Sequence, residues 1–313
     1  MIRQFLIVTH ADDLHGLTVQ AAVRQRGFAC HIVECDELGG REAINFCVGP
    51  DGVGPTMLRT SEGSLLNIAG IETIWWRRFK ARQQVGDTRM ADDRTSLIDN
   101  DCSGALVGSL QNGFCGKWIS NPVDTEFASN KLNQLAAASH CGQRIPDTVV
   151  TQSPSVVRAF LERHEQHVIV KPVVGTRGPL LFTQMVRKEH LKSEDSIRAC
   201  PAIYQECIPG TRHIRLNCFG DRSFAGLIES DDLDWRPNLD VPISRWPVPP
   251  SVHRDIRRVL DRLNLAMGII DLKETPDGEL VWLEVNPQGQ FLFLEGLTGE
   301  PLTEHFADFL TTV

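Results

Sequence analysis

Two apolar runs near the C-terminal end of the chain flank a short polar turn and predict a β-hairpin. The runs cover residues 267–272 and 280–285, and the turn between them contains the sequence Thr-Pro-Asp-Gly, which is typical of a chain reversal. Polar side chains interrupt this apolar pattern at three places: Asp271, Glu284 and Asn286. Glu284 and Asn286 lie two residues apart, so a strand points both to one face of the sheet.

These three polar side chains form a candidate magnesium site. We expect Asp271 to end the first strand, to pair with Trp282 and to lie diagonal to Glu284 on the same face. Two carboxylates and one amide oxygen are ligands that Mg²⁺ takes, and two close carboxylates repel each other unless a cation neutralises them. The alternative is a surface hairpin whose acidic residues are only solvated.

The N-terminal part of the chain follows the pattern of a βαβ unit. Residues 5–9 and 29–33 are short apolar runs that predict buried strands, and the stretch between them predicts a helix that ends near Gly27. The turn after the first strand lacks the glycine-rich fingerprint of dinucleotide-binding proteins. Residues 71–79 predict a further strand.

Two basic residues, Arg77 and Arg78, lie near the end of this further strand. They could present guanidinium groups to a carboxylate or a phosphate. The alternative is a solvated edge strand that merely ends in basic residues.

The middle of the chain predicts two capped helices and two strands that carry candidate binding groups. A boundary is expected near residues 121–122, and Ser129 or Asn130 would cap a helix over 131–140. A second helix is predicted to start at Ser153-Pro154 and to reach Arg163. A short apolar strand then brings Lys171 to the start of a glycine-containing loop, an arrangement that can bring a point charge and backbone N–H groups to a phosphate.

The strand predicted over residues 203–208 enters Pro209-Gly210 and is a candidate hinge. Arg215 follows on the next strand, and an amphipathic helix is predicted over residues 252–263. A last helix is expected over residues 302–310.

Composition narrows the function classes. The chain has 313 residues, 42% of them hydrophobic and 23% charged, which is typical of a globular protein with a substantial core. The formal charge is −8, so no global basic field favours nucleic acid as a partner.

Nine scattered cysteines without Cys-x-x-Cys spacing indicate reduced thiols, and no apolar run is long enough for a signal peptide or a membrane span. We therefore expect a cytoplasmic protein.

The order of these candidate groups along the chain resembles that of the ATP-grasp ligases. The resemblance covers roughly residues 121–296, and its most specific phrase is Leu-Glu-Val-Asn-Pro at 283–287. Within that superfamily the chain is similar to the RimK-like branch, and most closely to the graspetide (microviridin-type) peptide maturases. The closer match rests on Trp-Trp-Arg-Arg-Phe at 75–79, Asn-Lys-Leu at 130–132, Ile-Pro-Asp-Thr at 145–148, Pro-Asp-Gly-Glu at 276–279 and Asn-Pro-Gln-Gly-Gln at 286–290.

This resemblance implies an α/β (α+β) chain with the ATP-grasp fold. Its parts would be an N-terminal pre-ATP-grasp domain over 1–120, a central lid over 121–208 and a C-terminal subdomain over 209–313. It also implies the cofactors ATP and Mg²⁺ and a role for each candidate residue. The phosphates would be held by Lys131 and Lys171; adenine would be received around Gln205, Glu206, Cys207 and Ile208; the γ-phosphate would face Arg215 and Arg236; Mg²⁺ would be bound by Asp271, Glu284 and Asn286.

Two departures from the family pattern bear on these roles. His213 stands where RimK-like sequences usually carry an acidic residue that could contact the ribose. The loop Gly-Thr-Arg-Gly at 175–178 replaces the more common Gly-Ser-x-Gly. The contacts of the ribose and of the phosphates therefore stay open at these two places.

The activity implied by the resemblance is the formation of ester or amide cross-links within a ribosomal precursor peptide. An Asp or Glu side chain of the peptide would be activated as an acyl phosphate, and a Thr or Ser hydroxyl or a Lys amine of the same peptide would displace phosphate. The partner would be a leader plus a core peptide, and the resemblance suggests a homodimer; Arg77 and Arg78 could help to bind the acidic peptide. The alternatives are a RimK-like ligase that adds glutamate or another amino acid to an acceptor, and a nucleotide-binding regulator without turnover.

Overall fold

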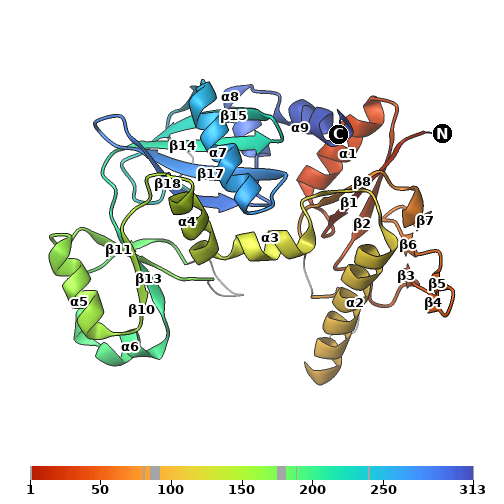
Figure 1. Cartoon of the computed structure of the whole chain (residues 1–313), viewed down its shortest axis with the longest axis horizontal. Coiled ribbons are helices and arrows are strands. Elements are labelled where there is room, and N and C mark those ends of the chain that lie inside the picture. Colours follow the sequence, from red (N-terminus) through yellow and green to blue (C-terminus); the bar gives the residue numbers. More distant parts are fainter. Residues whose placement is uncertain are drawn as a thin grey trace.

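A parallel sheet forms the N-terminal part of the computed structural model, which describes residues 2–79, 82–84, 92–174, 181–187, 189–238 and 240–312 (Figure 1). The strand order is β2-β1-β8-β9. The predicted βαβ unit is confirmed as β1 (Gln4–Thr9), α1 (Leu14–Gln25) and β2 (Ala29–Glu34). The further strands are β8 (Thr73–Trp76) and β9 (Lys117–Ile119). The alternative of a solvated edge strand does not apply to β8, because this strand lies between β1 and β9.

Both faces of this N-terminal sheet are covered, as the alternation along β1 shows. Leu6 and Val8 point into a core that includes residues of α2 (Asp92–Gly113). Phe5 and Ile7 point into a second core, which is shared with α1 and with the C-terminal helix α9 (Leu302–Thr312). The first and last helices of the chain therefore pack side by side on one sheet (Figure 1).

Small elements fill the connection between β2 and β8. They are β3 (Ile44–Asn45), β4 (Val48–Gly49), β5 (Gly52–Val53), β6 (Met57–Arg59), β7 (Leu65–Asn67) and the 3₁₀ helix η1 (Ile68–Gly70).

A small antiparallel sheet, the lid sheet, lies at the lower left of Figure 1, in the order β10-β13-β11-β12. Its strands are β10 (Thr148–Thr151), β11 (Val168–Lys171), β12 (Gln184–Met185) and β13 (Ala202–Glu206). The sequence Ser153-Pro154 starts α5 (Pro154–Arg163), as predicted. This helix packs on the sheet through Val157, Phe160 and Leu161, together with Ile197 of α6 (Glu194–Ala199). The 3₁₀ helix η2 (His190–Lys192) precedes α6.

A five-stranded antiparallel sheet, the C-terminal sheet, has the order β16-β15-β14-β17-β18. The strands are β14 (Arg212–Phe219), β15 (Arg222–Glu229), β16 (Ile243–Trp246), β17 (Met267–Glu274) and β18 (Leu280–Asn286). One face packs on the predicted amphipathic helix α7 (Pro250–Arg262). Beyond β18 comes α8 (Leu292–Thr298), a helix that the sequence did not predict.

The predicted hairpin is present as β17 and β18, but its register differs from the prediction. Asp271 does not end the first strand, which continues to Glu274. Asp271 lies opposite Glu284, while Leu272 lies opposite Trp282. The register shift between Asp271 and Leu272 leaves one extra residue on β18, which is a β-bulge. The two carboxylates are therefore direct cross-strand neighbours rather than diagonal ones.

Two short helices connect the N-terminal sheet to the C-terminal sheet (Figure 1). They are α3 (Pro122–Ser129) and α4 (Lys131–His140), and Asn130 lies between them, where its side chain caps α4 by accepting from the Leu132 N–H. The buried side chain of Gln134 fixes α4 to β18, because its Oε1 accepts from the Val285 N–H at 3.0 Å. This contact places the first residue of α4 close to the carboxylates of the hairpin.

The hydrophobic cores show which helices and strands pack together. Ala128, Ala137 and Ala138, from α3 and α4, belong to the core of the C-terminal sheet. The lid core draws instead on the chain between β10 and β13. The domain boundaries at residues 120 and 208 stay a prediction.

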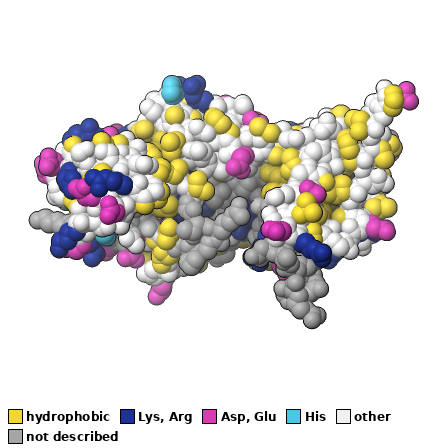
Figure 2. All heavy atoms as spheres, turned by 90° about the horizontal axis from the view of Figure 1, so that it is seen from below, with side chains coloured by type: hydrophobic (Ala, Val, Ile, Leu, Met, Phe, Trp, Pro, Cys, Tyr) yellow, Lys and Arg dark blue, Asp and Glu magenta, His cyan; other side chains and the backbone are white. Residues whose placement is uncertain are grey.

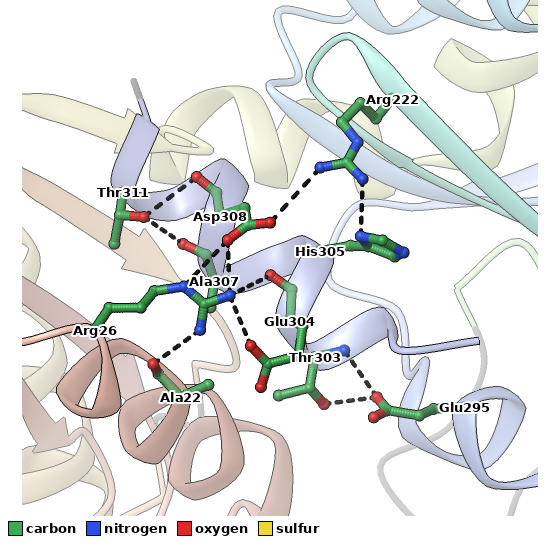
Figure 3. A network of polar contacts seen from close by, with 10 residues as sticks. All are labelled: Ala22, Arg26, Arg222, Glu295, Thr303, Glu304, His305, Ala307, Asp308 and Thr311. Carbon is green, nitrogen blue, oxygen red and sulfur yellow. Dashed lines mark hydrogen bonds and ion pairs between the residues drawn. The ribbon is translucent and has the colours of Figure 1, made fainter. Parts of the chain in front are cut away.

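A polar network ties α1 to α9 and to the start of β15 (Figure 3). Arg26, which caps the C-terminal end of α1, donates to Asp308 at 2.7 Å and forms an ion pair with Glu304. On the other side, Arg222 contacts Asp308 and His305. None of the described helices is both long enough and apolar enough to cross a membrane.

Candidate functional site

A cavity of ≈ 260 Å³ lies between the lid sheet and the C-terminal sheet. We call it the interlobe cavity. It brings together residues that are up to 153 positions apart in the chain, from Lys131 to Glu284. The predicted site residues that line it are Lys131, Lys171, Gln205, Glu206, Cys207, Ile208, Arg236, Asp271 and Glu284. Arg215 and Asn286 are the predicted site residues outside this lining.

Two lysines reach the interlobe cavity from different elements. Lys171 is the last residue of β11, and Lys131 is the first residue of α4, whose Nζ donates a long hydrogen bond of 3.4 Å to the Pro172 carbonyl. Burial lowers the pKa of the Lys171 ammonium, and the neighbouring Glu284 carboxylate opposes that shift. An ammonium that lies near other cations in a cavity is suited to bind a phosphate.

Arg236 adds a third cation to the interlobe cavity. Its Nε donates to Asp234 at 2.7 Å, and this bond raises the pKa of Arg236. Burial raises the pKa of Asp234, but the bonds from Arg236 outweigh burial and the pKa is lowered. Arg236 is therefore a fixed cation, and Asp234 is a partner that the sequence did not reveal.

Arg215 is an ion-pair partner of Asp271 in this structure. It lies opposite Asp271 on β14 and β17, and its Nη1 donates to both carboxylate oxygens, at 2.8 Å each. Its Nη2 donates to the Gln290 carbonyl at 3.3 Å. The role predicted for Arg215, facing a γ-phosphate, stays a prediction, and Arg215 is not among the residues that line the interlobe cavity.

The residues predicted to bind Mg²⁺ fit that ion in their donor atoms. Asp271 and Glu284 are cross-strand neighbours that both line the interlobe cavity. Asn286 lies two residues beyond Glu284 and is exposed, and its Oδ1 accepts from the Gln288 N–H at 3.0 Å. Carboxylate and amide oxygens in this arrangement match the hard-ligand preference of Mg²⁺. The structure thus brings two of the three predicted ligands together, with the third farther along the same strand.

The hinge end of the interlobe cavity is more apolar. Ile169, Leu181 and Ile208 line it. The N–H groups of Glu206 and Cys207 already donate within the lid, to Asp147 at 2.9 Å and to His167 at 3.0 Å. An aromatic base at this end would therefore contact apolar side chains. Its hydrogen bonds to the backbone would have to use groups other than these two N–H groups.

Two residues of the cavity wall were not predicted as binding groups. His213 and Lys273 lie opposite each other on β14 and β17, and both line the cavity. Burial, followed by the nearby Lys273 ammonium, lowers the pKa of His213 to about 4. The signal in the sequence is the alternation along β14, because His213 precedes Arg215 by two residues and so shares its face, about 7 Å nearer the hinge.

Two further features singled out in the sequence are the pair Arg77 and Arg78 and the glycine-containing loop after Lys171. The strand end at Arg77 and Arg78 is not solvated, because Arg77 is fully buried (0% exposed). The glycine-containing loop after Lys171 lies outside the described residues from position 175 onward.

Solved structures share this architecture along the whole chain. The macrocyclase MdnC from Microcystis aeruginosa MRC, bound with the precursor peptide MdnA, is 22% identical, with a TM-score of 0.88 over 99% of this chain and 100% of that chain. A Chryseobacterium gregarium RiPP-associated ATP-grasp ligase, in complex with ADP and a leader and core peptide, is 23% identical, with a TM-score of 0.88 over 99% and 97%. The chain has the ATP-grasp fold.

A third structure is that of the ATP-grasp ligase PsnB with its minimal precursor, Mg and ADP. It is 22% identical, with a TM-score of 0.80 over 98% of this chain and 96% of that chain. No protein-family model and no curated protein matches the sequence. The resemblance to ATP-grasp peptide maturases stated from the sequence is thus confirmed for the fold.

Proposed function

We propose that this protein is an ATP-dependent ligase that activates carboxylates of a peptide and joins them to nucleophiles of the same peptide. The observation that carries the proposal is the interlobe cavity, in which the cations Lys131, Lys171 and Arg236 face the carboxylates Asp271 and Glu284. A cavity that combines these cations with metal-binding oxygens suits a magnesium–nucleotide complex. The peptide as substrate is supported by the similar solved structures, two of which hold a precursor and one a leader and core peptide.

Each part of the interlobe cavity has a task in this proposal. Asp271 and Glu284, with Asn286, would hold Mg²⁺. Lys131 and Lys171 would bind phosphate oxygens, and the apolar hinge end would receive the base. ATP supplies the phosphoryl group that turns a carboxylate, whose oxide is a poor leaving group, into an acyl phosphate.

The contribution of the chain is therefore electrostatic positioning. Arg236 is fixed by Asp234, so it can face the transferred charge without reorganising. Arg215 orients Asp271 through its Nη1, which donates to both carboxylate oxygens. A hydroxyl or amine that then displaces phosphate yields an ester or an amide.

Intact-mass spectrometry tests this function. A Thr- and Glu-rich peptide encoded beside the gene is incubated with the protein, ATP and Mg²⁺. Loss of one water per ring is the expected result for intramolecular condensation. A gain of one amino-acid residue would favour the RimK-like alternative, and consumption of ATP with no change of mass would contradict this peptide as the acceptor. The predicted homodimer and the cytoplasmic location stay predictions.

A further inference from the structure

A second cavity, of ≈ 570 Å³, lies where α3 crosses from the C-terminal sheet to the N-terminal sheet. We call it the waist cavity, because α3 joins the two lobes here (Figure 1); Figure 2 shows apolar side chains on both sides of the middle of the molecule. Its apolar walls include Trp76, Phe79, Val107 and Val123. None of its described lining residues belongs to the interlobe cavity.

Three side chains that line the waist cavity carry polar atoms without a hydrogen-bond partner. These atoms are Nη2 of Arg77, Oγ1 of Thr125, and both Nε2 and Oε1 of Gln288. Arg77 is 0% exposed and Thr125 is 7% exposed. Buried polar atoms without partners are rare and destabilising. Their clustering on one cavity wall indicates a ligand that supplies the missing bonds.

Arg77 is held so that its Nη2 has no hydrogen-bond partner. Its Nη1 donates to the carbonyls of Gln288 and Gly289, and its Nε lies 3.4 Å from the Asp13 carboxylate. Burial, partly opposed by Asp13, lowers the pKa of Arg77 to about 10, so the group is charged at neutral pH. Asp13 is fixed in turn by Thr9, whose hydroxyl donates to it at 2.8 Å.

The free groups of the waist cavity match a carboxylate in an apolar setting. A guanidinium edge and an amide N–H donate to carboxylate oxygens, and Arg78 adds a second cation against one acidic residue of the lining, Glu126. The apolar walls would cover the methylene groups of the same side chain. A phosphate-sized anion would leave those walls uncovered.

The waist cavity also lies near the C-terminal end of β18, the strand that carries Glu284. Gln288 follows Glu284 by four residues, so their Cα atoms are at most about 14 Å apart. A peptide anchored at Gln288 could therefore present another of its side chains, about four residues along, to the carboxylates of the interlobe cavity.

We propose that the waist cavity is a peptide subsite that binds one Asp or Glu side chain of the substrate through Arg77 and Gln288, while a second acidic side chain is activated in the interlobe cavity. This inference rests on the proposed function. It assigns the recognition of the distance between two acidic side chains of the peptide to residues outside the nucleotide site.

Fluorescence anisotropy with the full-length protein, Mg²⁺ and ADP tests this assignment. The probes are a short fluorescein-labelled peptide of Glu, Thr and Gly, and the same peptide with Gln in place of Glu. We expect the wild type to bind the Glu peptide more tightly than the Gln peptide. Gln288→Glu should weaken binding of the Glu peptide about tenfold or more by charge repulsion.

A second variant blocks the cavity without touching its polar wall. Val123 is on the rim and 62% exposed, so Val123→Trp should fill the entrance at little expense in stability and weaken the Glu peptide similarly. Val156→Trp, at a 41% exposed position on α5, makes the same change elsewhere and should leave binding as in the wild type. Equal binding of the two peptides by the wild type, or unchanged binding of the Glu peptide by both Gln288→Glu and Val123→Trp, would overturn the subsite.

Nucleotide affinity separates this outcome from a failure of the proposed function. ADP affinity, measured by calorimetry, should be the same in the wild type, Gln288→Glu and Val123→Trp. If ADP does not bind the wild type at all, the proposed function fails. If ADP binds and the peptide measurements are negative, only the waist-cavity subsite fails.

Discussion

The two cavities lie next to the same strand, β18, but their charged groups are held in opposite ways. In the interlobe cavity Asp271 and Arg236 are held by ion pairs with Arg215 and Asp234, and the Lys171 ammonium lies near the Glu284 carboxylate. In the waist cavity Arg77 is held mainly by backbone carbonyls, and polar atoms remain without partners. A site of balanced charges suits a ligand that brings its own cation, such as a magnesium–nucleotide complex. A site with a free cationic edge suits a simple anion.

The largest effect is expected where the waist cavity touches the core. Arg77→Met removes the cation that faces the buried Asp13 and should lower the free energy of unfolding by about 3 kcal/mol, because an uncompensated buried charge remains. Arg78→Met, at a half-buried neighbour, should change it by less than about 1 kcal/mol. Urea unfolding followed by circular dichroism measures both. Equal effects would mean that Arg77 is not the buried partner of Asp13.

The next largest effect tests the metal-binding wall of the interlobe cavity. Glu284→Gln keeps the shape of the side chain but removes a charge that would bind Mg²⁺, so ATP consumption should fall at least about 100-fold. Glu279→Gln, on an exposed residue of the same hairpin, is the matched control and should retain activity. The assay follows ATP consumption over a range of Mg²⁺ concentrations. Full activity of Glu284→Gln would remove this residue from the metal site.

A smaller effect is expected at the phosphate wall. Lys171→Met should weaken binding of a magnesium complex of a non-hydrolysable ATP analogue about tenfold, because one charge-assisted bond is lost. Lys192→Met makes the same change at an exposed lid position. Isothermal titration calorimetry should therefore separate the two variants. If both weaken binding equally, Lys171 contributes only to the overall charge.

Much of this arrangement follows from local patterns in the sequence. Three predicted features depend only on neighbouring residues, and each is present: the alternation along β1, the cap Asn130 before α4 and the Thr-Pro-Asp-Gly turn of the hairpin. The two carboxylates of the hairpin were recognised for the same reason, because polar residues within apolar strands stand out.

The parts that escaped prediction depend on distant residues. Arg77 is buried because Asp13 and the carbonyls of Gln288 and Gly289 surround it, and those carbonyls lie more than 200 positions away. The bulge after Asp271 changes the pairing of the hairpin by one residue, which the period of two along a strand does not reveal. The sequence therefore indicates which charged residues belong to a site, but it does not indicate which distant residues form their hydrogen bonds and ion pairs.

The last prediction concerns the pH dependence of stability and involves two buried histidines, His15 near Arg77 and His213 in the lining of the interlobe cavity. Nε2 of His15, behind Arg77, accepts from the N–H groups of Phe291 and Leu292, and burial, followed by the nearby Arg77 charge, lowers the pKa of His15 to about 3. Burial and Lys273 lower that of His213 to about 4. An unfolded histidine has a pKa of about 6.5, so below that pH the unfolded chain binds more protons than the folded chain.

The free energy of unfolding should therefore be independent of these two histidines above pH 6.5 and fall as the pH decreases toward 4. Each contributes a slope of up to about 1.4 kcal/mol per pH unit. Urea unfolding between pH 7 and pH 4.5 should show a shallower slope for His15→Gln than for the wild type, whereas His190→Gln, at an exposed position, should follow the wild type. His213→Gln should flatten the slope in the same direction. If His15→Gln and His213→Gln both keep the wild-type slope, the two rings are not held neutral by their surroundings, and the bond from the Phe291 N–H to His15 would need another explanation.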